Sequence, residues 1–293
     1  MDPESTPTLS TMVLESDLIG HDDASRSFRT PVRVDELGDA RGEPVVFLHG
    51  LLGQNEHWFP VARRLSDRCR CLMFELPLLQ LRGAACSVDG VTNLTISVLE
   101  AIVGSPAILV GNSLGGHVAQ KIAMQRPDLC RAIVLAGSSG LFERTLEKGV
   151  EHRPSREWIE RKIKDLFYDE ANIPEGCVDR AYAELSDRRA ARAIVKLGRS
   201  AKSDHLGSKL SGVRQPVLLL WGRQDNVTPP SVADEFHELL PDSRLVWLDH
   251  CGHTPMLDQP ERFAQSVRDF LSELAFRYPA ARVADEIEAS EES

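Results

Sequence analysis

A serine set among glycines is the residue best suited to chemistry in this sequence. Ser113 lies in Gly111-Asn-Ser-Leu-Gly-Gly116, directly after the apolar run Ala107–Val110 and directly before a helical pattern. A serine at a sharp strand-to-helix turn exposes its hydroxyl, and the flanking glycines remove β-carbons that would collide as the two elements pack. The first N–H groups of the helix also favour negative charge. The pattern predicts that Ser113 is a nucleophile.

A serine nucleophile needs a base, and His253 is the histidine best placed to act as one. It lies in His250-Cys-Gly-His-Thr254, in the loop after the predicted strand Arg244–Leu248. Active sites of open α/β sheets gather at the carboxyl ends of their strands. His250 is the nearby competitor. His49 is expected instead to order the loop that follows it by hydrogen bonding.

An acid must orient the imidazole, and Asp225 also follows a predicted strand, Pro216–Trp221. The alternative for Asp225 is an Asx turn or a helix cap, because a proline pair opens the next helix shortly afterwards. Asp249 is the rival acid, since it lies close to His253 in sequence. We predict a catalytic triad of Ser113, Asp225 and His253.

Short apolar runs bounded by turn residues predict the strands that position these side chains. The runs are Pro44–Leu48, Cys69–Phe74, Ala107–Val110, Arg131–Leu135, Pro216–Trp221 and Arg244–Leu248. Nearly continuous apolarity is typical of strands buried on both faces, as in a parallel sheet. Helical spacing occurs between the runs, at Val91–Val103, Leu114–Gln125, Ser231–Leu240 and Glu261–Leu274. This alternation predicts an α/β fold with a mostly parallel central sheet and helices on both faces.

The chain divides into a core, an insertion and two tails. Residues 1–27 are polar and lack a period, so we expect a flexible N-terminal segment, followed by an edge strand at Phe28–Leu37. Residues 28–140 and 211–276 form the predicted core. Residues 141–210 are charged, with helical stretches near Trp158–Phe167 and Val178–Leu197. They predict a helical cap, although an ordinary solvated helical excursion fits the same composition. Residues 277–293 are expected to be an acidic flexible tail.

Composition narrows the classes of function. The chain has 293 residues, enough for a substantial core, and a formal net charge of -10, which argues against nucleic acid as a partner. No apolar run approaches the roughly 20 residues that span a bilayer, and the acidic N-terminus is unlike a signal peptide. The six cysteines form no CxxC pair and indicate reduced thiols in a cytoplasmic protein. We expect no metal and no organic cofactor.

The order of these motifs resembles that of the α/β-hydrolase fold family. Nucleophile, acid and base follow one another in that family's order, with a helical insertion before the acid, and the resemblance covers about Phe28–Leu274. His49-Gly-Leu-Leu-Gly53 is similar to the family's loop after the third strand. The resemblance implies an oxyanion hole formed by the backbone N–H groups of Leu51 and Leu114. Serine rather than aspartate at position 113 disfavours the dehalogenases and epoxide hydrolases of the superfamily.

One loop departs from the family's pattern. Where the family usually has Asp-x-Pro-Gly-x-Gly-x-Ser, this chain has Glu75-Leu-Pro-Leu-Leu-Gln-Leu81. Because two expected glycines are missing, we expect a bulkier and more apolar substrate entrance.

These features predict a serine hydrolase that cleaves a small-molecule carboxylic ester through an acyl-enzyme intermediate. The side chains expected to face Ser113 are mostly apolar, which predicts a small to medium apolar acyl group, although several of them could instead pack cap against core. They are Leu51, Leu52, Trp58, Phe59, Leu78, Leu79, Leu114, Leu141, Phe142, Trp158 and Met256. A charged acyl chain would need a partner such as Arg144 or Arg153.

Two alternatives remain, and the oligomeric state stays open. A carbon–carbon bond hydrolase acting on vinylogous diketones from aromatic ring cleavage is the first, since the Gly-Asn-Ser-x-Gly-Gly elbow resembles those enzymes. They commonly have Trp directly after the triad histidine, where this chain has Thr254. A non-catalytic ligand-binding protein on the same fold is a remote second, against which a complete triad argues.

Overall fold

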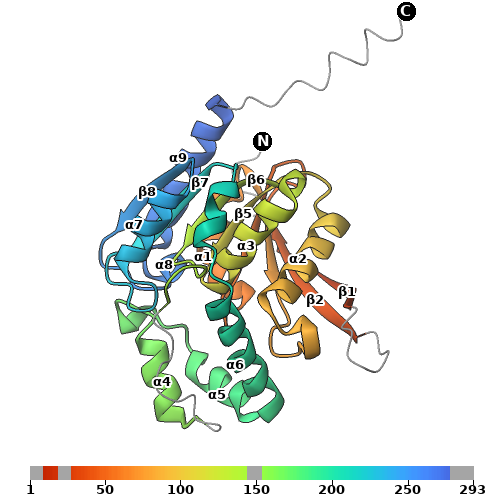
Figure 1. The fold of residues 1–293 in the computed structure, drawn as a ribbon, viewed down its shortest axis with the longest axis vertical. Coiled ribbons are helices and arrows are strands. Elements are labelled where there is room, and N and C mark those ends of the chain that lie inside the picture. The colour runs from red at the N-terminus through yellow and green to blue at the C-terminus, as the bar shows by residue number, and fades with distance from the viewer. Residues whose placement is uncertain (1–8, 19–27, 144–153, 278–293) are drawn as a thin grey trace, which may run out of the picture.

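The computed structural model describes residues 9–18, 28–143 and 154–277, and these form one eight-stranded sheet in the order β1-β2-β4-β3-β5-β6-β7-β8 (Figure 1). The strands are β1 (Ser10–Leu18), β2 (Phe28–Leu37), β3 (Glu43–Leu48), β4 (Cys69–Glu75), β5 (Ala107–Asn112), β6 (Cys130–Ala136), β7 (Val217–Gly222) and β8 (Ser243–Leu248). β2 pairs antiparallel with β1 and β4, and the neighbouring pairs from β4 to β8 are parallel. The predicted mostly parallel sheet is confirmed.

Helices cover both faces of this sheet. The helices are α1 (Phe59–Leu65), α2 (Val88–Ile102), α3 (Leu114–Gln125), α4 (Arg156–Lys164), α5 (Cys177–Ser186), α6 (Arg188–Ser203), α7 (Pro230–Leu239), α8 (Pro255–Asp258) and α9 (Pro260–Arg277). Short 3₁₀ turns are η1 (Asn55–Trp58), η2 (Gly83–Ala85), η3 (Pro127–Leu129), η4 (Glu170–Asn172) and η5 (Gly207–Gly212). The four helical patterns in the predicted core correspond to α2, α3, α7 and α9.

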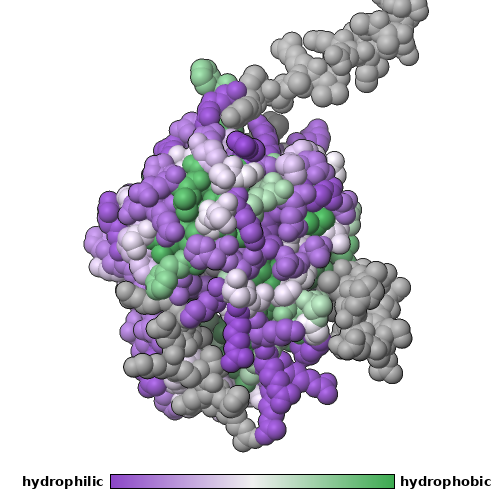
Figure 2. Space-filling view, viewed as in Figure 1, coloured by the Kyte–Doolittle hydropathy of each residue, from purple (hydrophilic) through white to green (hydrophobic). Residues whose placement is uncertain are grey.

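Alternation along each strand sends side chains to two separate cores. On β3, Val46 and Leu48 pack with α2, α3 and α7, whereas Val45 and Phe47 pack with α1 and α9. Because both faces are covered, both sets of side chains must be apolar, which is why the sequence shows continuous apolar runs. Figure 2 shows mainly hydrophilic residues on the visible outer surface, as expected when helices shield the sheet.

The N-terminal segment differs from the prediction. Residues 10–18, expected to lack regular structure, form β1, which pairs with β2 along its whole length. β1 is therefore the edge strand of the sheet, and β2, which we predicted at the edge, is the second strand. Met12 and Leu14 pack against the core, and antiparallel backbone pairing with β2 orders the rest of the strand. Residues 1–8, 19–27 and 278–293 lie outside the described part of the chain.

The helices α4, α5 and α6 form a separate group at one end of the molecule (Figure 1). The predicted helical stretch near Val178–Leu197 is divided into α5 and α6 at Asp187. The Asp187 carboxylate accepts hydrogen bonds from the first N–H groups of α6 at 2.7 and 2.8 Å and so starts a new helix. Ile159, Leu185 and Ile194 pack together and against Leu51 and Leu52 of the core. Burying each such side chain contributes about 1.5–3 kcal/mol, so this contact holds the helical group over the sheet.

Among the described residues, no helix combines the length and the apolarity that a bilayer crossing requires.

Candidate active site

Ser113 stands at a strained turn between β5 and α3. Its backbone angles are φ 51° and ψ -118°, a region that residues with a β-carbon rarely adopt. The helix α3 approaches two strands closely: a β-carbon at Gly115 would lie 2.1 Å from the carbonyl oxygen of Leu48 at the end of β3, and one at Gly111 of β5 would lie 2.4 Å from the backbone of Gly115. The glycines are therefore required for this turn, which costs about 1–3 kcal/mol in strain and presents the Ser113 side chain.

The loops after β7 and β8 bring Asp225 and His253 together. His253 Nδ1 donates a hydrogen bond to Asp225 Oδ2 at 2.9 Å, and the two side chains are 5% and 0% exposed. Such a bond leaves Nε2 as the free nitrogen of the imidazole and fixes the orientation of the ring.

The Asp225 carboxylate is held by its own loop. Oδ1 accepts hydrogen bonds from the N–H groups of Val227 and Thr228 at 2.8 and 2.9 Å, and Oδ2 accepts one from the Thr228 hydroxyl at 2.8 Å. The Asx turn is thus present together with the contact to His253, so the turn does not exclude a role for Asp225 in orienting the imidazole. This network satisfies a fully buried carboxylate.

The rival acid and base lie elsewhere. Asp249 forms an ion pair with Arg223, with Oδ1 2.8 Å from Nε, and its side chain is 58% exposed. His250 is exposed and its ring lies against Tyr168. His49 orders its loop as predicted: Nδ1 donates to the carbonyl of Gly50 at 2.8 Å, and Nε2 accepts from the N–H of Leu76 at 3.0 Å.

Burial and charge act in opposite directions on His253. Burial alone lowers the pKa of the imidazole, because the protonated form loses hydration. The charge of Asp225 and its hydrogen bond to Nδ1 raise that pKa, Glu143 raises it further, and the net pKa is above the usual 6.5. The surroundings of His253 therefore favour the protonated imidazole more than water does.

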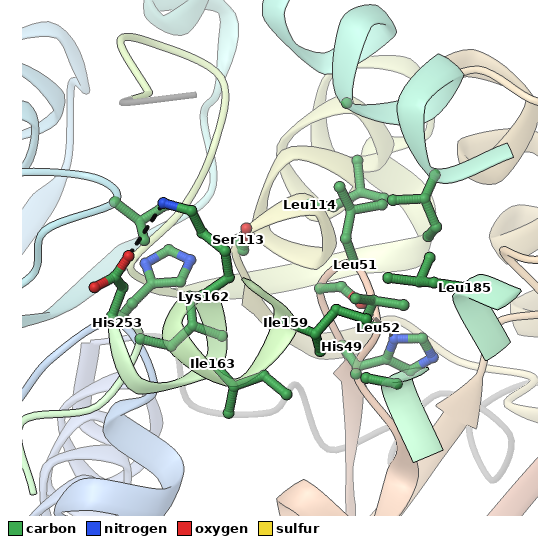
Figure 3. Close-up of a pocket in the computed structure, with 18 of the residues that line it drawn as sticks. His49, Leu51, Leu52, Ser113, Leu114, Ile159, Lys162, Ile163, Leu185 and His253 are labelled. Carbon is green, nitrogen blue, oxygen red and sulfur yellow. Dashed lines mark hydrogen bonds and ion pairs between the residues drawn. The ribbon is translucent and has the colours of Figure 1, made fainter. Parts of the chain in front are cut away.

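Ser113 and His253 line the same pocket (Figure 3). Ser113 Oγ lies 3.5 Å from Ser139 Oγ, and among the described residues no hydrogen bond joins it to His253. Contacts of this kind often tighten only when substrate binds, so the arrangement is compatible with proton transfer from Ser113 to His253.

The two residues expected to form the oxyanion hole belong to the same pocket. Leu51 and Leu114 both line the pocket, and Leu114 is the first residue of α3. Within the described part of the chain, neither N–H group has a hydrogen-bond acceptor. A free N–H at a helix N-terminus beside a nucleophile, as at Leu114, is suited to an oxyanion, and the free N–H of Leu51 is a second candidate donor.

The pocket has a volume of about 1520 Å³ and extends from Ser113 to the inner sides of α4, α5 and α6. Five of the predicted wall residues line it, namely Leu51, Leu52, Leu114, Trp158 and Met256. Apolar side chains that the sequence analysis did not select complete the wall, including Ile159, Ile163, Leu185, Ile194, Val227 and Leu257.

The other predicted wall residues are corrected by the structure. Trp58 is 0% exposed and packs between Phe47 and Phe263, with ring centroids 5.2 and 5.9 Å away, and Phe59 packs in the same core. The reason is the face of the sheet on which they lie: η1 and α1 cover the same face as α9, opposite the face covered by α2, α3 and α7. These residues belong to the core and do not line the pocket.

The unusual loop after β4 also turns inward. Leu78 is 3% exposed and packs in the core beside α2, while Leu79 packs against the helical group without lining the pocket. A tight turn, in which the Leu78 N–H donates to the Leu76 carbonyl at 2.8 Å, directs the chain this way. The expected apolar entrance is therefore not formed by this loop.

The segment after β6 gives the last corrections. Leu141 is buried in the core, and Phe142 is 54% exposed, so neither lines the pocket. Arg144 and Arg153 lie outside the described residues.

Several residues that sequence reasoning missed support the site. Asn112 Nδ2 donates to the carbonyl of His253 at 2.9 Å and ties the two loops together. Gly137 has φ 52°, and a β-carbon there would lie 3.0 Å from both Asp225 Oδ2 and His253 Nδ1. Ser139 and Glu143 border Ser113 and His253. The strand β6 lies between β5 and β7 in the sheet, so the loop that follows it ends at the same edge as Ser113 and Asp225. This position is the signal that could have identified the loop.

Among the described residues, no group of three or more His, Cys, Asp or Glu side chains could hold a metal ion.

Known hydrolases resemble this chain in sequence. Residues 45–266 match the profile of the alpha/beta hydrolase family. The chain is 31% identical over 248 residues to a pimeloyl-[acyl-carrier protein] methyl ester esterase of Nitrosomonas europaea, covering 79% of this chain and 96% of that protein. It is 29% identical over 254 residues to a 2-hydroxy-6-oxo-6-(2'-aminophenyl)hexa-2,4-dienoic acid hydrolase of Metapseudomonas resinovorans, covering 82% and 87%.

A solved alpha/beta hydrolase structure is also similar to this chain, in both sequence and fold. MGS-MChE2, an alpha/beta hydrolase enzyme from the metagenome of lagoon sediments at Mar Chica, Morocco, is 30% identical, with a TM-score of 0.66. The match covers 83% of this chain and 95% of that one.

Proposed function

The chain belongs to the alpha/beta hydrolase family and is a hydrolase, and on this premise we propose that it cleaves carboxylic esters with Ser113 as nucleophile, His253 as base and Asp225 as the orienting acid. The observation that carries the proposal is the 2.9 Å hydrogen bond between His253 and Asp225 in the pocket that also holds the strained Ser113. A residue held at such a cost needs a functional reason.

The proposed mechanism uses each of these groups in turn. Ser113 Oγ attacks the ester carbonyl while His253 Nε2 accepts its proton, and Asp225 stabilises the imidazolium. The N–H groups of Leu51 and Leu114 hold the tetrahedral oxyanion, each contributing on the order of 3 kcal/mol. The alcohol leaves with a proton from His253, and water, activated by the same imidazole, then releases the carboxylic acid.

The pocket wall supports an apolar acyl group. Leu52, Ile159, Leu185 and Met256 line the space around Ser113. Each methylene buried against such a wall contributes about 0.8 kcal/mol, so kcat/KM is expected to rise threefold to fourfold per added CH₂ until the pocket is filled.

Carbon–carbon bond cleavage is the second candidate function. It is favoured by the 29% identity to the dienoic acid hydrolase and by the Gly-Asn-Ser-x-Gly-Gly elbow. Ester cleavage is preferred because the relative at 31% identity is an esterase and because Thr254 follows the base.

A turnover screen separates the two candidates. We expect p-nitrophenyl acetate, butyrate and hexanoate to be hydrolysed with rising kcat/KM, and a ring-cleavage dienoate to be turned over far more slowly. Faster turnover of the dienoate than of every ester would reject ester cleavage as the main activity. Loss of both activities in Ser113→Ala would tie either one to this site.

A further inference from the structure

One helix of the group over the sheet carries a row of cations that has no role in the mechanism above. The helix α6 contains six basic residues and no acidic one, in a chain of formal net charge -10. Five of the six recur every three or four residues, which places them on one side of the helix. These five, named the α6 cation row, are exposed and line the pocket that holds Ser113: Arg188, Arg192, Lys196, Arg199 and Lys202.

The α6 cation row works against the stability of its own helix. Like charges four residues apart, as at Arg188, Arg192 and Lys196, repel one another, and a cation in the first turn opposes the helix dipole. A solvated helix face usually mixes both signs of charge, which relieves this repulsion. Among the described residues, only two carboxylates line the pocket, Glu143 and Asp165. An excess of positive charge along one wall of a pocket is therefore better explained by an anionic ligand than by solvation alone.

Three arginines of the row are available to such a ligand. Among the described residues, Arg188, Arg192 and Arg199 have neither an ion pair nor a side-chain hydrogen bond. Lys196, in contrast, donates to a backbone carbonyl of the core. The lysine and the arginine that line the pocket from α4 and α5 are paired with carboxylates, Lys162 with Asp165 at 3.2 Å and Arg180 with Glu184 at 3.3 Å.

The helix α6 also reaches the end of the pocket where the reaction would occur. A β-carbon at Gly198 would lie 3.9 Å from Leu51 Cδ1, and Ile194 lines the pocket beside them. Leu51 is one of the two residues expected to form the oxyanion hole. An ester with its carbonyl at Ser113 therefore has room for an apolar part against Leu51 and Ile194 and for a charged part against the α6 cation row.

The size of the pocket supports a substrate with two such parts. Its volume of about 1520 Å³ exceeds the roughly 300–1,000 Å³ of a usual ligand pocket, so a short apolar ester fills only part of it. From Arg188 to Arg199 the row extends along about 16 Å of helix. Guanidinium groups bind phosphate with two hydrogen bonds each, and a phosphate monoester carries nearly two charges at neutral pH. Phosphate therefore matches several neighbouring arginines better than a single carboxylate does.

We propose that the α6 cation row is a phosphate-binding site, and that the substrate is an ester whose apolar part fills the inner pocket while a remote phosphate group contacts Arg192 and Arg199. The inference rests on the proposed function, since it takes the ester to react at Ser113. The phosphate belongs to a soluble molecule rather than to a lipid surface. The apolar side of α6, including Ala193 and Leu197, is buried in the core, so this helix has no apolar side left to enter a membrane.

Binding of hexyl phosphate to Ser113→Ala, with hexanol as the neutral counterpart, tests the site without turnover. Calorimetry should show hexyl phosphate binding at least about tenfold more tightly than hexanol, and Arg192→Gln or Arg199→Gln in that background should weaken it by about tenfold. Arg189→Gln is the matched control, because Arg189 is exposed on α6 and does not line the pocket, and its affinity should not change. Equal affinities for the two ligands, or an equal loss in Arg189→Gln, would overturn the phosphate site.

Turnover of two p-nitrophenyl esters tests the substrate class. The 6-phosphonooxyhexanoate and the 6-methoxyhexanoate share a leaving group and an acyl chain and differ in the phosphate. The wild type should have about tenfold higher kcat/KM for the phosphorylated ester, mainly through a lower KM, and added salt should reduce this preference. Arg192→Gln should lose the preference and Arg189→Gln should keep it.

The outcomes separate the inference from the proposed function. An enzyme that hydrolyses both esters equally well would overturn the phosphate-bearing substrate and leave the proposed function intact. Hydrolysis of neither ester, with hexyl phosphate still bound through Arg192, would reject the proposed function and support the phosphate site. Vesicles of phosphatidylglycerol and of phosphatidylcholine distinguish the source of the phosphate, and we expect the protein to sediment with neither. Sedimentation with phosphatidylglycerol that Arg192→Gln abolishes would overturn the soluble source and assign the phosphate to a lipid head group.

Discussion

His253 Nδ1 and Asp225 Oδ2 lie 2.9 Å apart although the two residues are 28 positions apart in the chain. The parallel pairing of β7 with β8 explains this contact, because both strands end at the same edge of the sheet and each residue lies in the loop after its strand. Thr228 and Gly137 complete the arrangement, the first by donating to the carboxylate and the second by leaving room for both side chains.

The contact predicts the effect of removing the charge of Asp225. Asp225→Asn should leave the fold intact and lower kcat by about four powers of ten, because the amide stabilises the wrong imidazole tautomer and no imidazolium. Circular dichroism checks the fold and steady-state kinetics the rate. Asp249→Asn is the matched control: Asp249 pairs with Arg223 at the surface, so its kcat should stay near that of the wild type. A large loss in Asp249→Asn with a mild one in Asp225→Asn would identify the other acid.

The pH profile follows from the raised pKa of His253. The base must be neutral to accept a proton, so kcat/KM should fall as the pH drops through that pKa, with a midpoint above the usual 6.5. Asp225 and Glu143 are the two carboxylates that raise this pKa. Glu143→Gln should therefore move the midpoint to lower pH, as measured with a neutral ester. A midpoint below 6.5 in the wild type, or an upward shift in the variant, would contradict this electrostatic account.

The strain at Ser113 predicts an unusual order of stabilities. Ser113→Gly should unfold at a higher denaturant concentration than Ser113→Ala, because glycine adopts φ 51° without a steric cost. Relief of about 1–3 kcal/mol, less about 0.4–1 kcal/mol for the greater freedom of unfolded glycine, leaves a difference of about 1 kcal/mol. Both variants should be inactive. Equal unfolding free energies would mean that the turn is unstrained.

Two tryptophans of the predicted pocket wall give opposite predictions, because only Trp158 lines the pocket. Trp58→Phe should lower the free energy of unfolding by about 1–2 kcal/mol through lost core packing and leave the acyl-chain preference unchanged. Trp158→Ala should shift the preferred acyl chain to a greater length, because Trp158 lines the pocket. Thermal unfolding and a p-nitrophenyl ester series measure the two effects. A changed ester preference in Trp58→Phe would place that residue back at the substrate.

The sequence predicted the sheet and the candidate triad because both depend on local patterns. Doubly buried strands require continuous apolar runs, and the turn at Ser113 requires glycines at Gly111 and Gly115, so each leaves a visible signal. β1 was missed because its apolar alternation at Met12 and Leu14 is short, and its order depends on backbone pairing with β2, which no side-chain pattern reveals.

The wall of the pocket was harder to predict because it depends on rotation of elements about their axes. Trp58 and Trp158 are both apolar and both occur near a helix start, yet the first faces the core and the second the pocket. Glu143 was missed for a related reason: an isolated acid in a charged segment gives no signal until the fold places it in the pocket with Ser113 and His253. Local pattern determined which elements form, and tertiary packing determined which side chains meet.

The central claim is that Ser113 is the covalent nucleophile, and reaction with a fluorophosphonate followed by peptide mapping tests it most directly. The account predicts a single adduct on Ser113, formed by the folded wild type and slowed strongly in His253→Ala, since the unassisted hydroxyl is a weak nucleophile. Ser113→Ala should give no adduct. An adduct on another residue of the folded protein, or none at all, would contradict the claim.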